Sequence, residues 1–243
     1  MPWDFWLIFL FLAVILPWRG RSRLKKLLEK ADVGTSERLS LYASTIAFQW
    51  LAVAVVGWRA WAHGYTPAEL GLVLRWRGGI AIVAILGAAI LAAAQWFNLR
   101  RMGKISSPRS ALLQALAQRL FPQSGVELLP YFALAVTAGL CEEFLYRGFA
   151  MAALTRGGLP NWSVVLLSAV LFGLAHIYQG RGGFVSTLVI GTVFGTARIA
   201  YDSLAPVMVW HAAVDVVAGI AGPKYLSVKA NTVSEPEIQS RSH

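Results

Sequence analysis

The sequence contains a single cysteine and few charged residues, and each scarcity excludes a class of protein. Because Cys141 is alone among 243 residues, the chain can form no internal disulfide and has no CxxC metal site. Charged residues make up 14% of the chain, whereas soluble domains contain about 25%. Hydrophobic residues reach 57% and are concentrated in long runs. We therefore expect a polytopic membrane protein in a lipid bilayer rather than a soluble domain.

The net charge of +10 has two ordinary explanations, which are binding to a nucleic acid and basic loops on the cytoplasmic side of a membrane. The apolar composition favours the second, and we expect no nucleic-acid partner. Most of the 22 Lys and Arg residues lie in residues 19–38, 98–125, 179–183 and 222–243, which the alternation of spans places on one side. This asymmetry predicts that side to be cytoplasmic, with the N-terminus on the opposite side.

Seven apolar runs are candidates for membrane-spanning helices, since about 20 residues cross a bilayer. They are residues 3–17, 39–61, 80–97, 128–154, 161–178, 184–200 and 204–220. The basic residues after the first run follow its apolar stretch, which is the reverse of a signal peptide. We predict an all-α fold, a polytopic membrane helical bundle of about seven transmembrane helices, with a polar, disordered tail at 223–243.

Three shorter features are expected between these spans. Thr66 can cap a short helix that begins at Pro67, because Glu69 follows in the capping-box pattern. Residues 111–120 are expected to form an interfacial helix. Residues 19–38 are expected to form a basic, partly amphipathic segment at the membrane surface.

Two carboxylates and a guanidinium interrupt the apolar run 128–154. A charge near the centre of a bilayer costs about 3 kcal/mol or more, so such groups usually face a polar cavity and have a function. Glu143 and Arg147 are four residues apart and share one helix face, which predicts an ion pair. Glu142 points about 100° away from that face and is free to bind another group. The alternative is a single structural network of all three residues.

Two histidines lie in the later apolar runs. His176 ends the sequence Phe-Gly-Leu-Ala-His, and His211 precedes Asp215 by four residues, so that this pair also shares a helix face. With Glu142, these three residues can form one site that works in either of two ways. They can bind a divalent metal such as zinc, or Glu142 and one histidine can activate water while the others stabilise an oxyanion. Both schemes end in attack of water on a carbonyl.

Several common hydrolase motifs are missing. The sequence has no HExxH zinc-protease motif and no serine in a GxSxG setting. Nothing marks Cys141 as an activated thiolate, so we interpret it as a small apolar helix residue.

The depths of Glu142 and His176 in their predicted spans would differ by roughly a dozen Å in a bilayer about 30 Å thick. A shared site therefore requires the run 128–154 to extend beyond the bilayer, or the fifth span to continue past Tyr178. We expect the side chains of Glu142, His176 and His211 to converge within about 10 Å, since a shared water or metal needs ligands close together.

These residues together resemble a known family. The motifs Glu142-Glu143-x-x-x-Arg147, Phe172-x-x-x-His176 and His211-x-x-x-Asp215, in this order on three apolar helices, resemble the CPBP intramembrane proteases. This family includes the type II CAAX prenyl endopeptidases and is also called the Abi family. The resemblance covers roughly residues 66–222 and implies an α-helical intramembrane endopeptidase core there, after N-terminal spans and a basic interfacial segment at 1–65.

The resemblance also implies roles for the motif residues. Glu142 would activate water together with His176, and His211 with Asp215 would bind the catalytic water or a metal, or stabilise the oxyanion. Glu143, Arg147 and Phe172 would support the site. CAAX-processing members often carry Asn where this chain has Asp215, so a close match to their mechanism does not follow. The added negative charge favours a metal or a protonated partner.

The substrate implied is a membrane-associated protein or peptide, of CAAX type if the host prenylates its proteins. The composition and the short loops suggest a prokaryotic cell membrane. Two other functions are compatible with the sequence, namely a non-enzymatic immunity or scaffold protein and a proton-coupled transporter. The lack of an internal repeat counts against the transporter.

Overall fold

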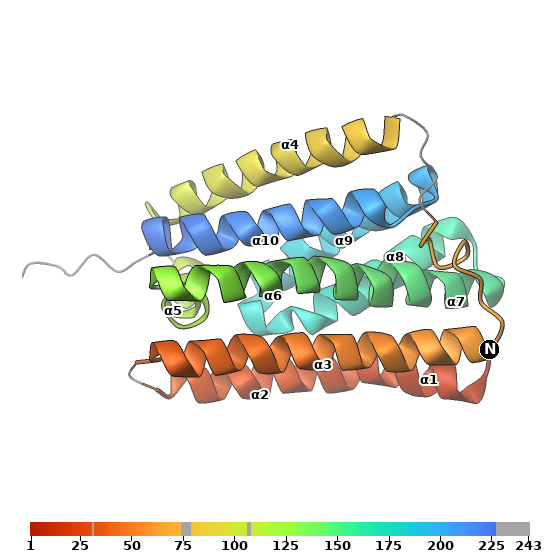
Figure 1. The fold of residues 1–243 in the computed structure, drawn as a ribbon, viewed down its shortest axis with the longest axis horizontal. Coiled ribbons are helices and arrows are strands. Elements are labelled where there is room, and N and C mark those ends of the chain that lie inside the picture. The colour runs from red at the N-terminus through yellow and green to blue at the C-terminus, as the bar shows by residue number, and fades with distance from the viewer. Residues whose placement is uncertain (31, 74–78, 106–107, 227–243) are drawn as a thin grey trace, which may run out of the picture.

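The computed structural model describes residues 1–30, 32–73, 79–105 and 108–226, and in these ranges the chain is a bundle of helices without strands (Figure 1). The predicted all-α fold is confirmed. The first helix runs through α1 (Trp3–Leu10), the π-helical turn η1 (Phe11–Ile15) and α2 (Leu16–Leu28). The helices that follow are α3 (Thr35–Ala62), α4 (Gly79–Met102), α5 (Pro108–Leu120), α6 (Gly125–Glu143), η2 (Phe144–Ala150), α7 (Met151–Arg156), α8 (Asn161–Ala175), η3 (Ile177–Gln179), α9 (Gly180–Tyr201) and α10 (Ala205–Leu226).

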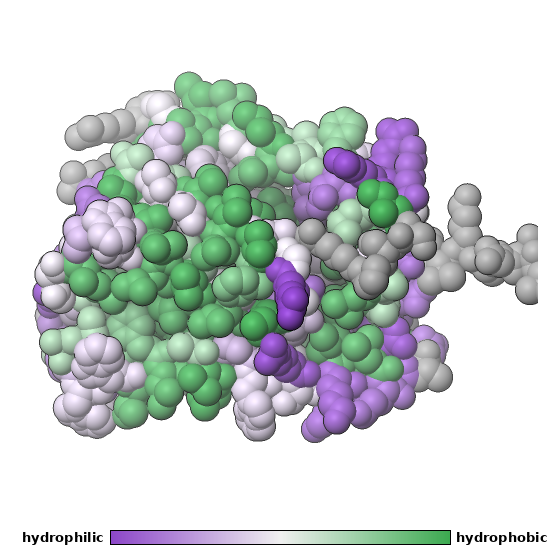
Figure 2. All heavy atoms as spheres, turned by 180° about the vertical axis from the view of Figure 1, so that it is seen from behind, coloured by the Kyte–Doolittle hydropathy of each residue, from purple (hydrophilic) through white to green (hydrophobic). Residues whose placement is uncertain are grey.

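Six helices within the described ranges are long and apolar enough to cross a membrane. They correspond to six of the seven predicted spans. The remaining one, α8, has 15 residues and a length of about 22 Å, which is less than the thickness of the bilayer's hydrocarbon core. Apolar side chains cover much of the face in Figure 2, and hydrophilic residues gather toward one end of it. That distribution is typical of a protein embedded in a bilayer.

Four predicted boundaries are wrong. The first helix continues to Leu28, because Lys, Arg and Leu are good helix formers and the end of the apolar stretch does not stop it. The fifth span ends at Ala175, and α9 already begins at Gly180 within the expected turn. Helix α10 continues to Leu226 with Pro223 inside it, so the tail starts later than predicted. The disordered state predicted for the rest of the tail concerns residues 227–243, outside the described part of the chain.

The Thr66 segment forms a turn instead of the predicted helix. The capping contacts are present, since Thr66 N–H donates to Glu69 Oε2 at 2.8 Å and Glu69 N–H donates to Thr66 Oγ1 at 3.3 Å. The segment closes after one turn because Gly71 adopts φ +72° and its neighbour Leu72 bonds back to the carbonyl of Pro67. These contacts, with the ion pair of Glu69 to Arg156, hold the pKa of the Glu69 carboxyl below its usual value.

Helix α6 lies between α3 and α10, and α4 packs on the far side of α10 (Figure 1). The N-terminal helix shares a core with the helix that carries the acidic cluster. Phe5 and Phe149, both fully buried, meet edge to face with ring centroids 4.9 Å apart. The division of the chain into two domains near residue 66 stays a prediction. Residues from before and after this position pack together in one hydrophobic cluster.

A helix covers the range expected at 111–120, as α5, and its position at the membrane interface stays a prediction. A buried ion pair joins the start of α3 to the start of α6 beside it. Arg38 Nε donates to Glu127 Oε2 at 2.9 Å, and Arg38 also donates to the carbonyl of Gln118 on α5. The pair ties these three helices together at the end of the bundle where most basic residues lie.

Candidate active site

The acidic cluster lies in one continuous helix that is longer than a bilayer is thick. Segments α6, η2 and α7 run together from Gly125 to Arg156, and these 32 residues span about 48 Å. Helix α8 starts after the next turn and runs back along them. Counted from that turn, Glu142 lies about 21 Å along the first helix and His176 about 22 Å along the second. The two residues therefore lie at the same depth, because the long helix extends past the bilayer and α8 is short.

The helix widens directly after the acidic pair. Residues Phe144–Ala150 form the π-helical turn η2, and every residue of this turn is buried, including Arg147. Such turns are rare and occur often at functional sites. Here the turn separates the acidic pair from the regular helix that continues to Arg156.

Glu143 is the centre of a buried network. Arg147 Nη1 donates to Glu143 Oε1 at 2.9 Å, and His211 Nδ1 lies 2.8 Å from the same oxygen. The side chains of Glu143 and Arg147 are both 0% exposed. The ion pair expected from their spacing is present, and it extends to a histidine on α10.

Phe172 packs against this network and against both histidines. The guanidinium carbon of Arg147 lies 4.2 Å from the centroid of the Phe172 ring. The ring centroids of His176 and His211 lie 4.5 Å and 5.8 Å from it. A cation over an aromatic face is stabilised, which suits a guanidinium with no access to water. Phe172 therefore holds the arginine and the two imidazoles in fixed relative positions.

Glu142 directs one carboxylate oxygen at the two imidazoles. Its Oε2 atom lies 3.8 Å from His176 Nε2 and 4.0 Å from His211 Nε2. His211 Nε2 is also 3.6 Å from Asp215 Oδ2. All four residues expected to share a site are thus brought together. His176 does not lie within its span as predicted but directly after it, at the C-cap of α8.

The other ring nitrogen of each histidine is held by an oxygen acceptor. His176 Nδ1 lies 2.9 Å from the carbonyl oxygen of Phe172, and His211 Nδ1 binds Glu143. Because an oxygen acceptor requires an N–H, this geometry assigns a proton to each Nδ1 and turns each Nε2 toward Glu142. Separations of 3.8 and 4.0 Å are too long for direct hydrogen bonds. A water about 2.8 Å from each atom would bridge them.

The same atoms do not form a metal-ligand set. Zinc ligands about 2.1 Å from the metal lie roughly 3.4 Å apart in a tetrahedron, and the separations here are larger. Within residues 1–30, 32–73, 79–105 and 108–226, no group of three or more His, Cys, Asp or Glu side chains is placed to hold a metal ion.

The three motif helices coincide with a match to a known family. Residues 124–217 match the family described as Type II CAAX prenyl endopeptidase Rce1-like. These residues form a Rce1-like domain. The match supports the CPBP family expected from the motifs, and with it a CAAX-type intramembrane protease in general. No curated protein and no solved structure matches the chain. With six long apolar helices among its described residues, the chain is an integral, multi-pass membrane protein.

Two residues near the site were not found from the sequence. Gln49 on α3 lies outside the Rce1-like domain, and its Nε2 atom donates to Glu142 Oε1 at 2.9 Å. Tyr131 on α6 donates its hydroxyl to the backbone carbonyl of Asp215 at 3.0 Å. Gln49 could have been found from the sequence, because it is a polar amide within the apolar run 39–61. Tyr131 could not, because its hydrogen-bond partner is a backbone atom.

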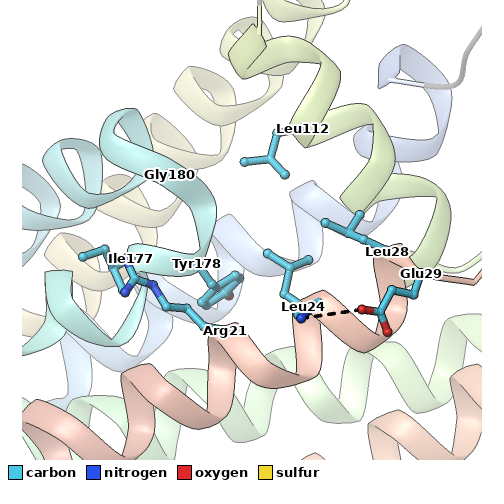
Figure 3. Close-up of a pocket in the computed structure, with 9 residues that line it drawn as sticks. Arg21, Leu24, Leu28, Glu29, Leu112, Ile177, Tyr178 and Gly180 are labelled. Carbon is cyan, nitrogen blue, oxygen red and sulfur yellow. Dashed lines mark ion pairs between the residues drawn. The ribbon is translucent and has the colours of Figure 1, made fainter.

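The candidate active site is fully buried at Glu143 and partly exposed at Glu142 and Asp215. Side-chain exposure rises from 0% at Glu143 to 19% at Glu142 and 35% at Asp215. A groove of about 540 Å³ lies between α2, α5 and the α8–α9 connection, which directly follows His176 (Figure 3). It is lined by Arg21, Leu24, Lys25, Leu28, Glu29, Leu112, Ile177, Tyr178 and Gly180. The ring of Tyr178 forms part of the wall, and its centroid is 5.9 Å from that of His176.

Proposed function

We propose that the protein is an intramembrane endopeptidase that hydrolyses a peptide bond of a membrane-associated protein or peptide, with water activated by Glu142 and His176. The observation that carries this proposal is the position of Glu142 Oε2, which is buried, accepts no hydrogen bond from the described residues and faces two imidazole nitrogens. An unpaired carboxylate oxygen is costly in a membrane interior unless a ligand or water uses it.

The proposed reaction needs no group beyond these side chains and water. Glu142 Oε2 takes a proton from the water while the water oxygen forms a bond to the carbonyl carbon. His176 Nε2 orients the water, and a proton on His211 Nε2 would bind the oxyanion. Glu142 then gives its proton to the amide nitrogen as the C–N bond breaks, which yields a carboxylic acid and an amine; transfer of the acid's proton to the released amine gives the carboxylate and the ammonium. Glu143 and Arg147 hold His211 and do not contact the substrate.

A cleavage assay with purified protein and an unbiased library of membrane-associated peptides tests this proposal. Wild-type cleavage that is lost in both Glu142→Ala and His176→Ala is the expected result. Equal inactivity of all three well-folded proteins would favour a non-enzymatic role. A chelator should leave activity unchanged, since the described side chains form no metal-ligand set. Library members with and without a prenylated CAAX end separate the two substrate types.

We propose further that the substrate reaches Glu142 through the groove beside His176, in a prokaryotic cell membrane as the composition suggests. The walls offer Leu24, Leu112 and Ile177 to an apolar segment, and Arg21 lies at the basic end of the bundle. Tyr178 connects the groove to the histidine, so a chain lying there would place its next residues at the water-activating pair.

Substitution of Leu112 by Trp is expected to raise KM several-fold with a smaller change in kcat, because the larger ring fills the groove without touching the reacting atoms. Steady-state cleavage of a library-derived peptide measures both constants. Ala111→Trp is the matched control, since Ala111 is exposed on the same helix and does not line the groove. Equal KM values for the two variants and the wild type would contradict this route.

A further inference from the structure

A polar side chain from the N-terminal half of the chain binds the carboxylate at the centre of the candidate site. Gln49 lies in α3, an apolar helix that packs against α6. Its Nε2 atom donates to Glu142 Oε1 at 2.9 Å across a sequence separation of 93 residues. The matched Rce1-like segment, residues 124–217, contains no part of α3. The contact therefore comes from outside the segment that carries all three motifs.

The hydrogen bond distinguishes the two oxygens of Glu142. Oε1 accepts from Gln49, whereas Oε2 faces His176 and His211. If the carboxylate of Glu142 rotates, its two oxygens exchange positions, and Oε2 no longer points at the water. A donor on one oxygen restricts that rotation, and it keeps the free oxygen as the one that can take a proton.

Packing alone does not explain an amide at this position. The Oε1 atom of Gln49 is buried and has no hydrogen-bond partner among the described residues. A buried, unsatisfied oxygen costs free energy in a membrane helix, where an apolar residue of the same size would cost none. The contact of the amide nitrogen with Glu142 is its one compensating interaction among those residues.

We propose that Gln49 is a positioning residue, which holds Glu142 so that Oε2 points at the water between the histidines. This inference rests on the endopeptidase function proposed above. The N-terminal helices then complete the active site rather than only anchoring the Rce1-like domain in the membrane. Gln49 acts through Glu142 and is not itself a catalytic residue.

Substitution of Gln49 by Met tests the proposal, because Met fills the same space and donates no hydrogen bond. We expect kcat to fall about 10- to 100-fold, the factor that one hydrogen bond to a charged group contributes, while KM changes less than twofold. Leu51→Met on the same helix is the matched control, since the Leu51 side chain is 62% exposed. Gln49→Leu serves as a second variant in case the first does not fold.

A double-mutant cycle measured by thermal unfolding tests whether Gln49 and Glu142 interact, and it does not depend on a cleavage assay. Gln49→Met and Glu142→Leu each leave one buried polar partner unpaired, so the double variant should lose less stability than the sum of the single losses. Wild-type kcat in Gln49→Met, with cleavage still abolished by Glu142→Ala, would overturn the positioning role and leave the endopeptidase intact. Additive losses in the cycle would overturn it even for a protein that cleaves no tested peptide.

Discussion

Replacement of Glu142 by Gln is expected to lower kcat about a thousandfold or more and to leave thermal unfolding nearly unchanged. Gln has the size and shape of Glu, so the packing around His176 is kept. It cannot take a proton from water, and general-base catalysis contributes typically 10²- to 10⁴-fold. The measurement is steady-state cleavage of a peptide from the library, with unfolding in the same detergent followed in parallel.

The control for this variant is Glu37→Gln, a carboxylate at the start of α3 whose side chain is 39% exposed and pairs with Lys30. It should keep full activity, because it lies on the protein surface away from the site. If Glu142→Gln retained more than a tenth of the wild-type kcat, Glu142 would not be the base. Another group would then have to accept the proton from water. His176 Nε2, 3.8 Å from Glu142 Oε2, is the nearest described candidate.

Removal of the Arg147 guanidinium by Arg147→Met should destabilise the protein by about 3–5 kcal/mol, because Glu143 would remain charged and buried without its cation. The loss includes the stacking of the guanidinium on Phe172. Reversible unfolding in detergent with a denaturant measures the change. The double variant Glu143→Gln with Arg147→Met should recover part of the loss, since it removes both buried charges.

An exposed ion pair provides the comparison for this effect. Arg156 and Glu69 are 2.6 Å apart, and their side chains are 41% and 38% exposed. Arg156→Met should cost about 1 kcal/mol or less from the ion pair itself, because solvent screens such pairs. Arg156 also donates to the carbonyls of His63 and Gly64, so the total loss in Arg156→Met includes those bonds. A loss of less than about 1 kcal/mol for Arg147→Met would contradict the stabilising role of the buried pair.

The local pairings were predictable because they depend only on helix geometry. Residues four apart share a face, and both Glu143–Arg147 and His211–Asp215 are in contact in the structure at 2.9 Å and 3.6 Å. Long apolar runs likewise predicted most of the membrane-spanning helices, since the thickness of the bilayer sets their length. The three motifs in order predicted the family that residues 124–217 match.

Helix ends were predicted less well, for reasons that involve neighbouring structure. The first helix does not stop where its apolar residues stop, and the capping residues at Thr66 form a single turn that Gly71 closes. A Cβ atom at Gly71 would meet the guanidinium of Arg198 on α9 at less than 3 Å. Arg198 also donates to the carbonyl of Glu69 at 3.0 Å, so a residue more than a hundred positions away helps to hold that turn.

By itself, the sequence determined the class of the protein, the candidate site residues and the pairs that share a helix face. Hydrophobicity and helical periodicity act over a few turns, so they can be read along the chain. Only the tertiary structure decided that His211 binds Glu143, that Glu142 faces two imidazoles and that Gln49 donates a hydrogen bond to it. Those contacts depend on which helices are neighbours and how far each is shifted along the next. Packing of whole helix faces sets both, and no spacing within one helix encodes them.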